Sequence, residues 1–429
     1  MLKNMAFGVA LMAGSAQAAE VPKNVIFFIG DGMGPAYTTA YRYYQADSQV
    51  SQVTDTVFDR LLIGSASTFP HDETVVTDSA AGATALATGT KSYNGAIGVD
   101  AHKQPLDSML VQAKSMGWHT GVIATSHVNH ATPASFVAHA DSRRNYQEIA
   151  EQFYSRRLKE DQPLVDLILG GGQRYFPMEQ DQLGSKMVNW GYQYADKLTQ
   201  LDSLTRLPAL GLFAPKQLPY AVDSDQPKRL SAMVSTGLRL LSQSDTPFFL
   251  MVEGSLIDWC GHDNDIACAM KEMADFAGAL EVAEAFAQER GDTLVVFTAD
   301  HSTGGLTLGA GGEYRWEAEQ VKQTGASLRT ITDALLNQPQ EQFPQILARF
   351  LGFELTQGEL GELAKVSKEE EALRWKLASI LSGHSYTGWT TSGHTAVDVP
   401  LGAMGPGSER FRGHLDNTEI AKALKQMIR

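Results

Sequence analysis

The hydrophobic residues fall into short continuous runs separated by longer amphipathic segments. Five of these runs are rich in β-branched and aromatic residues and have the length of buried strands. Their apolar character is continuous rather than alternating, which is typical of a sheet covered on both faces. The five predicted strands lie at 25–29, 120–124, 167–169, 248–252 and 293–297.

Helix-like segments lie between these strands, among them 106–115, 229–242 and 270–290. An alternation of strand and helix predicts a parallel sheet between helix layers. We therefore expect an α/β fold, a three-layer sandwich with a mostly parallel central sheet. The 429 residues suffice for one large domain with insertions or for two ordinary domains, and composition alone does not distinguish these.

The region 313–381 has a different character. It has weak strand signals and contains amphipathic helical patches at 328–336, 343–350 and 368–381. We interpret it as a helical subdomain inserted into a main domain that spans 19–429.

The N-terminal residues have the three parts of a secretory signal peptide. Lys3 precedes an apolar run at 5–13, and Ala16-Gln17-Ala18 provides a small-residue cleavage site. We exclude 1–18 from the fold. The apolar run is too short to span a bilayer, and no later run approaches the roughly 20 apolar residues that a spanning helix needs. A periplasmic or secreted protein without a membrane anchor is expected.

The net charge is −14, which argues against binding to nucleic acids or anionic membranes because the long-range field repels polyanions. A small anionic substrate would then need a locally positive site. The two cysteines, Cys260 and Cys268, could pair across a short loop in an oxidising compartment, or could be two unpaired small residues. Neither has the spacing of a metal ligand.

Three of the predicted strands end in segments that carry carboxylates or histidines. Ligands of open α/β sheets gather outside the carboxyl ends of the strands. A single Asp at such a place is usually a cap or turn residue, but four carboxylates that converge without cations would repel one another. Metal ions would neutralise them, and mixed Asp/His sets suit zinc. The six residues are Asp31, Glu253, Asp258, His262, Asp300 and His301.

A further histidine could complete such a site from a Gly-flanked segment downstream. His394 in Ser392-Gly393-His394-Thr395 and His384 in Gly383-His384-Ser385 are the two candidates, and spacing alone does not choose between them. Six other histidines are interpreted as surface or structural residues: His71, His102, His119, His127, His139 and His414.

Ser79 is the candidate nucleophile. The small residues at 80–85 would let a helix start at this serine and pack closely, so that its hydroxyl would lie at a helix N-terminus. The helix dipole and the free N–H groups there favour an anion. Alternatively, the serine could be no more than an N-cap.

Six segments, in order, resemble those of alkaline phosphatases, and the resemblance spans the chain from Asn24 to about Arg412. It implies hydrolysis of small phosphate monoesters through a covalent phosphoserine on Ser79, in a homodimer with an alkaline pH optimum. The serine and TADH segments are the most specific. The segments are FFIGDGMG, VTDSAAGATALATGTKSYNGAIGVD, HATPASFVAHADSRR, FFLMVEGSLIDWCGHD, VVFTADHSTGG and SGHTAVDVP.

The same resemblance implies two zinc ions and one magnesium ion per chain. It also selects His394 over His384, which lacks the following Thr-Ala. The first zinc would be held by Asp258, His262 and His394. The second zinc would be held by Asp31, Ser79, Asp300 and His301. Magnesium would be held by Asp31, His130, Thr132 and Glu253.

The resemblance assigns Arg143 to bidentate binding of the phosphate, with Asp78 orienting it and Arg144 as an exposed neighbour. One well-known branch of the family carries Asp and Lys at the positions of His130 and Trp259. The imidazole nitrogen suits zinc better than magnesium, so we expect a third site that is less selective for magnesium. Trp259 cannot offer a cationic contact to phosphate, so product would leave faster, unless this side chain merely packs beside the cleft.

Alternative functions fit the sequence less well. A sulfatase would need Pro and Arg two and four residues after its nucleophile, whereas Ser79 is followed by Ala80-Ala81-Gly82-Ala83. A phosphodiesterase of the same superfamily is the closer alternative. A non-catalytic metal- or phosphate-binding protein is disfavoured because the nucleophile, the arginine and all metal positions are present.

Overall fold

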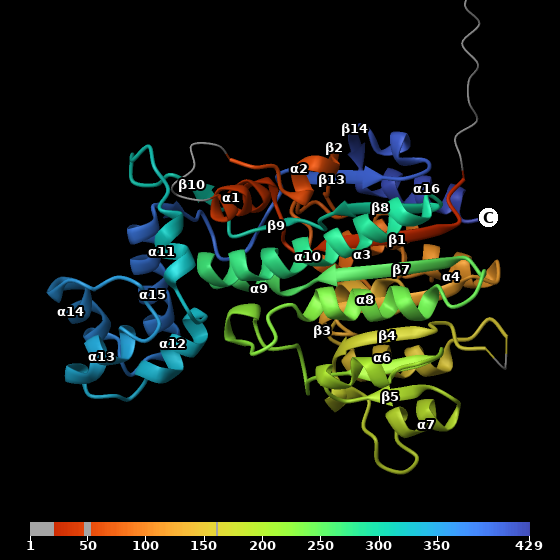
Figure 1. Ribbon diagram of the computed structural model, residues 1–429, viewed down its shortest axis with the longest axis horizontal. Helices are drawn as coiled ribbons and strands as arrows, with labels where there is room; N and C mark the ends of the chain where they lie inside the picture. Colours follow the sequence, from red (N-terminus) through yellow and green to blue (C-terminus); the bar gives the residue numbers. More distant parts are fainter. Residues whose placement is uncertain (1–20, 47–52, 160–161) are drawn as a thin grey trace, which may run out of the picture.

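A ten-stranded sheet forms the centre of the protein in the computed structural model, which describes residues 21–46, 53–159 and 162–429 (Figure 1). The predicted signal peptide at 1–18 therefore lies outside the described residues. The strands of this sheet are β1 (Asn24–Gly30), β2 (Leu62–Ser67), β3 (His119–His127), β4 (Leu167–Gly171), β5 (Gln193–Ala195), β6 (Ala209–Leu212), β7 (Phe248–Gly254), β8 (Thr293–Thr298), β13 (Val399–Met404) and β14 (Gly413–Asp416).

The order across the sheet is β14-β2-β13-β8-β1-β7-β3-β4-β6-β5. β13 runs antiparallel to both of its neighbours, and all other adjacent pairs are parallel. The five predicted strands are the five consecutive central strands from β8 to β4, and every residue of β1, β7 and β8 is buried. The prediction of a mostly parallel, doubly covered sheet is confirmed.

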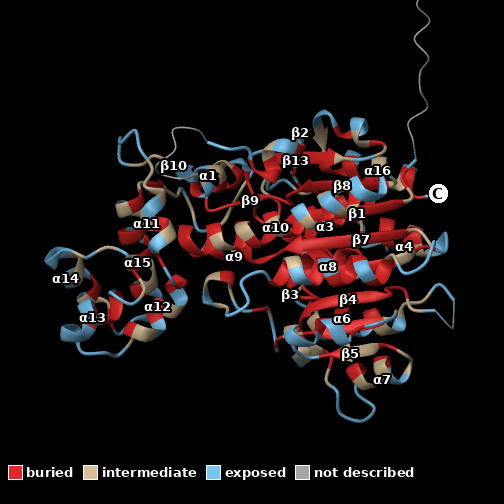
Figure 2. Ribbon diagram, viewed as in Figure 1, coloured by how far each residue is buried: buried red, intermediate tan, exposed pale blue. Residues whose placement is uncertain are grey.

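Helices cover both faces of this sheet. α8 (Arg229–Leu241) and α10 (Ile266–Arg290) pack against each other in front of it, and α3 (Ser79–Thr88), α4 (Met109–Ser115) and α16 (Asn417–Met427) lie behind it (Figure 1). Figure 2 shows that the buried residues concentrate between these layers. The remaining helices near the sheet are α1 (Pro35–Gln45), α2 (Val57–Leu61), α5 (Ala131–Ser135), α6 (Tyr146–Ser155), α7 (Leu183–Asn189) and α9 (Leu256–His262).

A group of helices lies beyond one end of the sheet, at the left of Figure 1. The group comprises α11 (Ala318–Gln323), α12 (Leu328–Leu335), α13 (Phe343–Leu347), α14 (Gln357–Lys365) and α15 (Glu370–Ser385).

Among the described residues, no helix has both the length and the apolar character needed to cross a bilayer.

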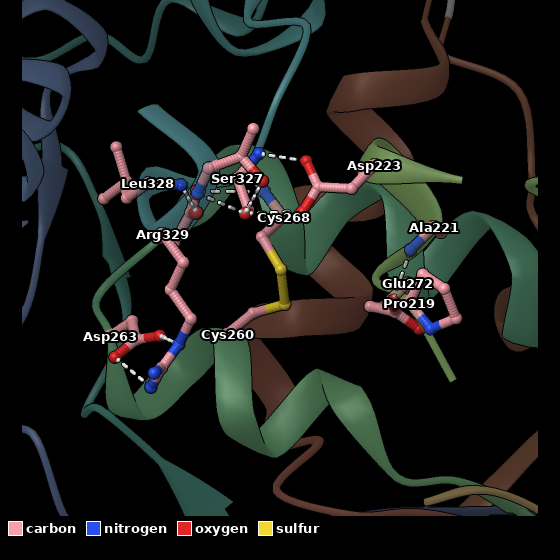
Figure 3. The surroundings of a disulfide bond; sticks show 12 residues. Pro219, Ala221, Asp223, Cys260, Asp263, Cys268, Glu272, Ser327, Leu328 and Arg329 are labelled. Atoms are coloured by element: carbon pink, nitrogen blue, oxygen red, sulfur yellow. Dashed lines mark hydrogen bonds and ion pairs between the residues drawn. A yellow bond between two sulfur atoms is a disulfide. The ribbon is translucent and has the colours of Figure 1, made fainter. Parts of the chain in front are cut away.

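The corner between α9 and α10 is fixed by a disulfide between Cys260 and Cys268, whose Cα atoms are 5.5 Å apart (Figure 3). Of the two alternatives for these cysteines, the structure therefore has the paired one. Asp263, inside the closed loop, accepts a hydrogen bond of 2.9 Å from Arg329 of α12 and forms an ion pair with Arg374 of α15 at 3.2 Å. The corner thus connects the sheet with the helical group.

Candidate metal centre

Sheet register brings three carboxylates to the same edge. In the parallel central strands, Ile29 of β1 pairs with Glu253 of β7 on one side and with Thr298 of β8 on the other. Asp31 and Asp300 each follow two residues after the paired position, so their side chains emerge beside that of Glu253. All three are fully buried.

The turn after β1 carries Asp31 close to α9. Gly32 has a φ of +73°, and a Cβ atom there would lie 2.8 Å from the Cα of Asp258, so this close approach requires glycine. The N–H of Gly32 donates to Oδ1 of Asp300 at 3.1 Å, and the N–H of His301 donates to the same oxygen at 3.0 Å. The other oxygen of Asp300 lies 3.3 Å from Nε2 of His301, at the centre of the cluster.

Ser79 is the first residue of α3 and does not cap it. The cap is Asp78, whose carboxylate accepts from the N–H groups of Ala81 at 2.9 Å and Gly95 at 3.0 Å. The interpretation of Ser79 as only an N-cap is therefore wrong. Its Oγ lies 3.2 Å from Nε2 of His301 and 3.4 Å from Oδ1 of Asp31.

Asp258, His262 and His394 form one group of potential ligands. Nε2 of His262 lies 3.3 Å from Asp258 and 3.2 Å from Nε2 of His394. The opposite ring nitrogens face backbone carbonyls: Nδ1 of His262 lies 2.6 Å from Ser392 O, and Nδ1 of His394 lies 2.9 Å from Thr77 O. Because a carbonyl only accepts, both Nδ1 atoms carry a proton, so in the neutral form of each ring Nε2 is the nitrogen with a free lone pair for a metal.

Two further groups share Asp31. One joins Asp31 with Asp258 and His301, and the other joins Asp31 with His130 and Glu253. Within each of the three groups, one potential ligand atom per residue lies within 4.8 Å of the others. The structure thus brings together the strand-end residues predicted from the sequence, and His394 and His130 with them.

The pattern of hydrogen bonding fits bound cations. Buried polar atoms normally have partners, yet five atoms of the predicted ligands have none. Four of them are oxygens, which suit hard cations such as magnesium, and one is an imidazole nitrogen, which suits zinc. They are Asp31 Oδ2, His130 Nδ1, Thr132 Oγ1, Glu253 Oε1 and Asp300 Oδ2.

The electrostatics of the protein alone also favour cations. Burial, followed by repulsion from Asp300 and other carboxylates, raises the pKa of Asp31 well above its usual value. Burial raises the pKa of Glu253 to about 7 and that of Asp300 to about 8. Burial alone would lower the pKa of His262, but its hydrogen bond to Asp258 raises it to about 9. Without cations, the cluster therefore holds protons at neutral pH.

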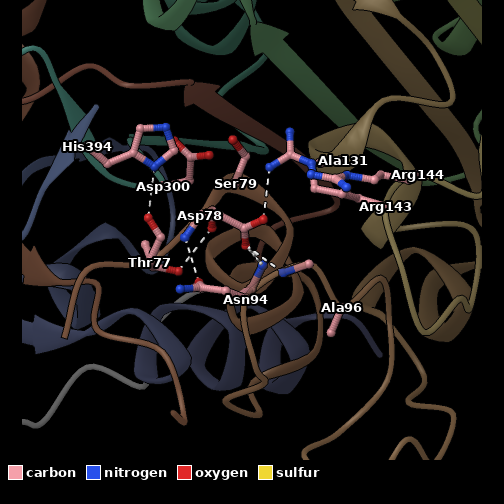
Figure 4. A network of polar contacts seen from close by, with 12 residues as sticks. Thr77, Asp78, Ser79, Asn94, Ala96, Ala131, Arg143, Arg144, Asp300 and His394 are labelled. Carbon is pink, nitrogen blue, oxygen red and sulfur yellow. Dashed lines mark hydrogen bonds and ion pairs between the residues drawn. The ribbon is translucent and has the colours of Figure 1, made fainter. Parts of the chain in front are cut away.

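Arg143 reaches the cluster from the loop that precedes α6. Its Nη1 donates to Oδ2 of Asp78 at 3.0 Å, and its Nη2 lies 3.2 Å from Nε2 of His130. Figure 4 shows its guanidinium next to Ser79, with Arg144 turned away from it. The ring of Trp259 lies 5.7 Å from that of His130 and is partly exposed.

Of the two downstream histidine candidates, only His394 lies in the cluster, and one residue that contacts the cluster was not predicted. His384 lies in α15, where its ring stacks on Phe353 and its Nε2 contacts Glu359 at 2.8 Å, so it is outside the cluster. Thr303 was not predicted, although its hydroxyl donates to Asp258 and lies 3.3 Å from Nδ1 of His301. Its position two residues after His301 was the one available signal.

Comparisons with known proteins agree with this geometry. The sequence profile of the family "Alkaline phosphatase" matches residues 22–429. Alkaline phosphatase 3 of Bacillus subtilis (strain 168) is 42% identical over 408 residues, which cover 93% of this chain and 87% of the relative. A solved cold-active alkaline phosphatase from a psychrophilic Shewanella species has a TM-score of 0.88 and 46% identity, and the match covers 95% of this chain and 100% of that one.

Two solved variants of the TAB5 alkaline phosphatase, in which one histidine is replaced by Glu or Asp, have magnesium bound in a site named M3. Each has a TM-score of 0.70 and 29% identity, and the match covers 96% of this chain and 99% of that one. The profile spans nearly the whole described chain, and the first relative exceeds one third identity over most of both lengths. This chain belongs to the alkaline phosphatase family.

Proposed function

We propose that the protein hydrolyses phosphate monoesters through a phosphoserine formed on Ser79. One observation carries the proposal: the Ser79 hydroxyl is not needed as a cap and lies at the start of α3, 3.2 Å from His301, where potential metal ligands meet. Free N–H groups at a helix N-terminus favour the anionic phosphoryl group.

The residues fit two zinc ions and one magnesium ion. When bound, such ions lower the pKa of a coordinated hydroxyl and stabilise the attacking and leaving oxygens of an in-line displacement. Asp31 is shared between the second and third sites. We assign the first zinc to Asp258, His262 and His394. We assign the second zinc to Asp31, Ser79, Asp300 and His301. We assign the third ion to Asp31, His130, Thr132 and Glu253.

The chain's own groups bind and orient the substrate. Arg143 donates to two phosphate oxygens, and its ion pair with Asp78 at 3.0 Å holds the guanidinium in place. Oγ of Ser79 attacks phosphorus, the new Oγ–P bond forms, and the bond from phosphorus to the ester oxygen breaks, which releases the alcohol. Water then cleaves the Oγ–P bond, releases inorganic phosphate and restores the serine.

The third site differs from a pure oxygen site because His130 contributes nitrogen. The TAB5 variants hold magnesium in a site named M3 after a histidine is replaced by an acidic residue. We propose that the third site of this chain, with its imidazole nitrogen, binds magnesium with less selectivity than an aspartate-containing site would, and that zinc competes there. We also propose that Trp259 borders the bound phosphate without a charged contact.

We also propose, from the sequence, export to the periplasm or medium and a helical insertion at about 313–381 within the domain 19–429. From the family resemblance, we propose a homodimer. We propose small phosphate monoesters as substrates, because the roles proposed for Arg143 and for the metal ligands all concern binding of the phosphoryl group.

Covalent labelling tests the central proposal. Wild-type protein loaded with zinc and magnesium is incubated with radiolabelled phosphate at acid pH, quenched and digested. Label is expected on the peptide that contains Ser79. Ser79→Ala should carry no label and retain its metals, whereas Ser92→Ala, at a buried serine outside the cluster, should label normally. Label on any other residue would contradict the assignment, and faster hydrolysis of an aryl diester than of the monoester would favour the phosphodiesterase alternative.

A further inference from the structure

Thr303 connects the two proposed zinc sites. It is fully buried, and its hydroxyl touches one ligand of each site: Oγ1 donates to Oδ1 of Asp258 and lies 3.3 Å from Nδ1 of His301. Asp258 belongs to the first site. His301 belongs to the second, because its Nε2 faces Ser79 at 3.2 Å.

The backbone holds Thr303 in this place from three sides. Its N–H donates to Gly32 O at 3.1 Å, and its carbonyl accepts from the hydroxyl of Tyr37 at 2.8 Å. In the short ladder between β9 (Ser302–Thr303) and β12 (His394–Thr395), Thr303 pairs with His394, itself a proposed ligand of the first zinc. The backbone position of Thr303 is therefore tied to the turn after β1 and to the segment that carries His394.

The positions of the protons on His301 and Thr303 set the direction of these hydrogen bonds. A metal at Nε2 of His301 leaves the proton on Nδ1, which then needs an acceptor. Among the described residues, the hydroxyl of Thr303 is the hydrogen-bond partner of this Nδ1. A hydroxyl has one proton and two lone pairs, so Thr303 can accept from His301 and donate its own proton to Asp258. The chain of donors runs from His301 through Thr303 to Asp258.

Thr303 differs in kind from the groups that orient the other two histidines. Nδ1 of His262 and Nδ1 of His394 face backbone carbonyls, which no side-chain substitution removes. The orientation of His301 depends on a side chain, and the same side chain steadies a carboxylate of the neighbouring site. Losing the hydroxyl would leave a buried N–H donor without a partner and would remove one hydrogen bond from Asp258.

We propose that Thr303 is a positioning residue that fixes the tautomer of His301 and the carboxylate of Asp258 together, so that a single hydroxyl sets the zinc affinity of both sites. This inference rests on the proposed zinc sites. Groups that orient metal ligands typically change metal affinity about 10–100-fold when removed. A residue that serves only to pack the core would instead change stability without changing affinity.

The test measures zinc binding to metal-depleted protein in competition with a chromophoric chelator. Thr303→Val keeps the shape of the side chain and removes the hydroxyl, so it should weaken zinc binding at both sites about 10–100-fold. Thr303→Ser keeps the hydroxyl and should remain close to wild type. Should the valine variant fail to fold, Thr303→Ala compared with Thr303→Ser gives the same contrast of hydroxyl against none.

Thr120→Val is the matched control. Thr120 is also a buried threonine, its hydroxyl contacts Leu164 O at 2.7 Å and the carboxylate of Asp166 at 3.3 Å, and it lies near the start of β3, away from the carboxyl edge of the sheet. It should lower the melting temperature and leave zinc affinity unchanged. Wild-type zinc affinity in Thr303→Val, or equal losses in Thr303→Ser and Thr303→Ala, would overturn the inference. Absence of tight zinc binding by the wild type would instead contradict the proposed function.

Discussion

Arg143 is placed for phosphate by a contact that leaves much of its guanidinium free. Its hydrogen bond to Asp78 fixes the plane of the group, and its other edge faces His130 and Ser79. Charge-assisted hydrogen bonds contribute about 1.5–3 kcal/mol each, and a bidentate pair adds directional specificity. Arg143→Ala should therefore weaken inhibition by inorganic phosphate about 10–100-fold, as measured by steady-state kinetics. Arg144→Ala, at an exposed neighbour, is the control and should leave inhibition unchanged.

The reverse result would reassign the role. If Arg143→Ala kept wild-type phosphate inhibition and Arg144→Ala lost it, then the exposed arginine would be the one that binds phosphate. Substrate turnover should fall less than phosphate affinity suggests, because metal ions also hold the phosphoryl oxygens.

The proposed third site includes a nitrogen ligand, His130, whose ring packs beside the partly exposed Trp259. His130→Asp combined with Trp259→Lys replaces a nitrogen ligand with a carboxylate and adds a cation beside the phosphate. We expect stronger dependence of activity on magnesium and tighter inhibition by phosphate, since oxygen ligands favour magnesium and a lysine can contact the anion. Metal analysis after dialysis against mixed zinc and magnesium, together with phosphate inhibition, measures both effects. Unchanged values for the double variant and for each single variant would contradict the prediction.

Single residues also show how far sequence reasoning extends. Asp31, Glu253 and Asp300 could be predicted from their positions after strands, because parallel strands end at a common edge. His130 lies at the start of the five-residue helix α5 and Arg143 lies in a loop, where no periodic pattern marks them, and only the family resemblance assigned them. Thr303 was predicted neither from strand-end position nor from the family resemblance, because nothing in the sequence distinguishes a threonine two residues after a ligand from other threonines.

At the scale of elements, burial on both faces decided which strands were predictable. The central strands β1, β7 and β8 each contain a continuous apolar run of four or five residues and stand out for that reason. β14 is largely exposed and only four residues long, so it has no hydrophobic signal. β13 contains Pro400, which argues against a strand within a sheet, and its register shifts near Leu401.

The disulfide between Cys260 and Cys268 joins α9 to α10. It closes a loop with a sequence separation of 8 between α9 and α10, and this loop contains His262. Closing so short a loop contributes about 2–3 kcal/mol by the chain-entropy estimate. The double variant Cys260→Ala, Cys268→Ala should lose about that much free energy of unfolding in denaturant titrations at fixed metal concentration. It should also bind the first zinc more weakly, because the segment that carries His262 is no longer closed.

Reduction of the wild-type protein provides the comparison for that variant. Wild type in reductant should match the double variant in stability and zinc affinity, if the covalent bond rather than the sulfur packing is responsible. A double variant with wild-type stability and zinc affinity would show that the ion pairs of Asp263 with Arg329 and Arg374 hold the corner by themselves.

For the molecule as a whole, the buried carboxylates make stability depend on both metal and pH. In metal-free protein, the pKa of Glu253 is about 7 and that of Asp300 about 8, whereas carboxyl groups in the unfolded chain titrate near 4. The folded state therefore binds these protons more tightly, and the stability they contribute is lost progressively from about pH 4 up to the folded-state pKa, about 7 for Glu253 and about 8 for Asp300. His262, with a pKa of about 9 against roughly 6.5 unfolded, loses its contribution in the same direction as pH rises through 9.

The buried histidines do not offset this loss. Burial lowers the pKa of His130 and of His301, so the stability they contribute is fully present above about pH 6.5 and does not change further. Between pH 7 and 9, every site group that still titrates in the metal-free fold thus acts in one direction. Bound cations would keep the carboxylates ionised across this range and remove the dependence.

We therefore predict that the melting temperature of metal-free protein falls from pH 7 to pH 9, while that of protein loaded with zinc and magnesium stays nearly constant and higher throughout. Each group that titrates in this window contributes up to about 1.4 kcal/mol per pH unit to the slope. Calorimetry of both forms at matched ionic strength measures the difference. Metal-free Asp300→Asn should show a shallower fall, because its amide oxygen can still accept from Gly32 while one titrating group is gone. Parallel curves for the two wild-type forms would mean that these carboxylates are not the groups that the metals neutralise.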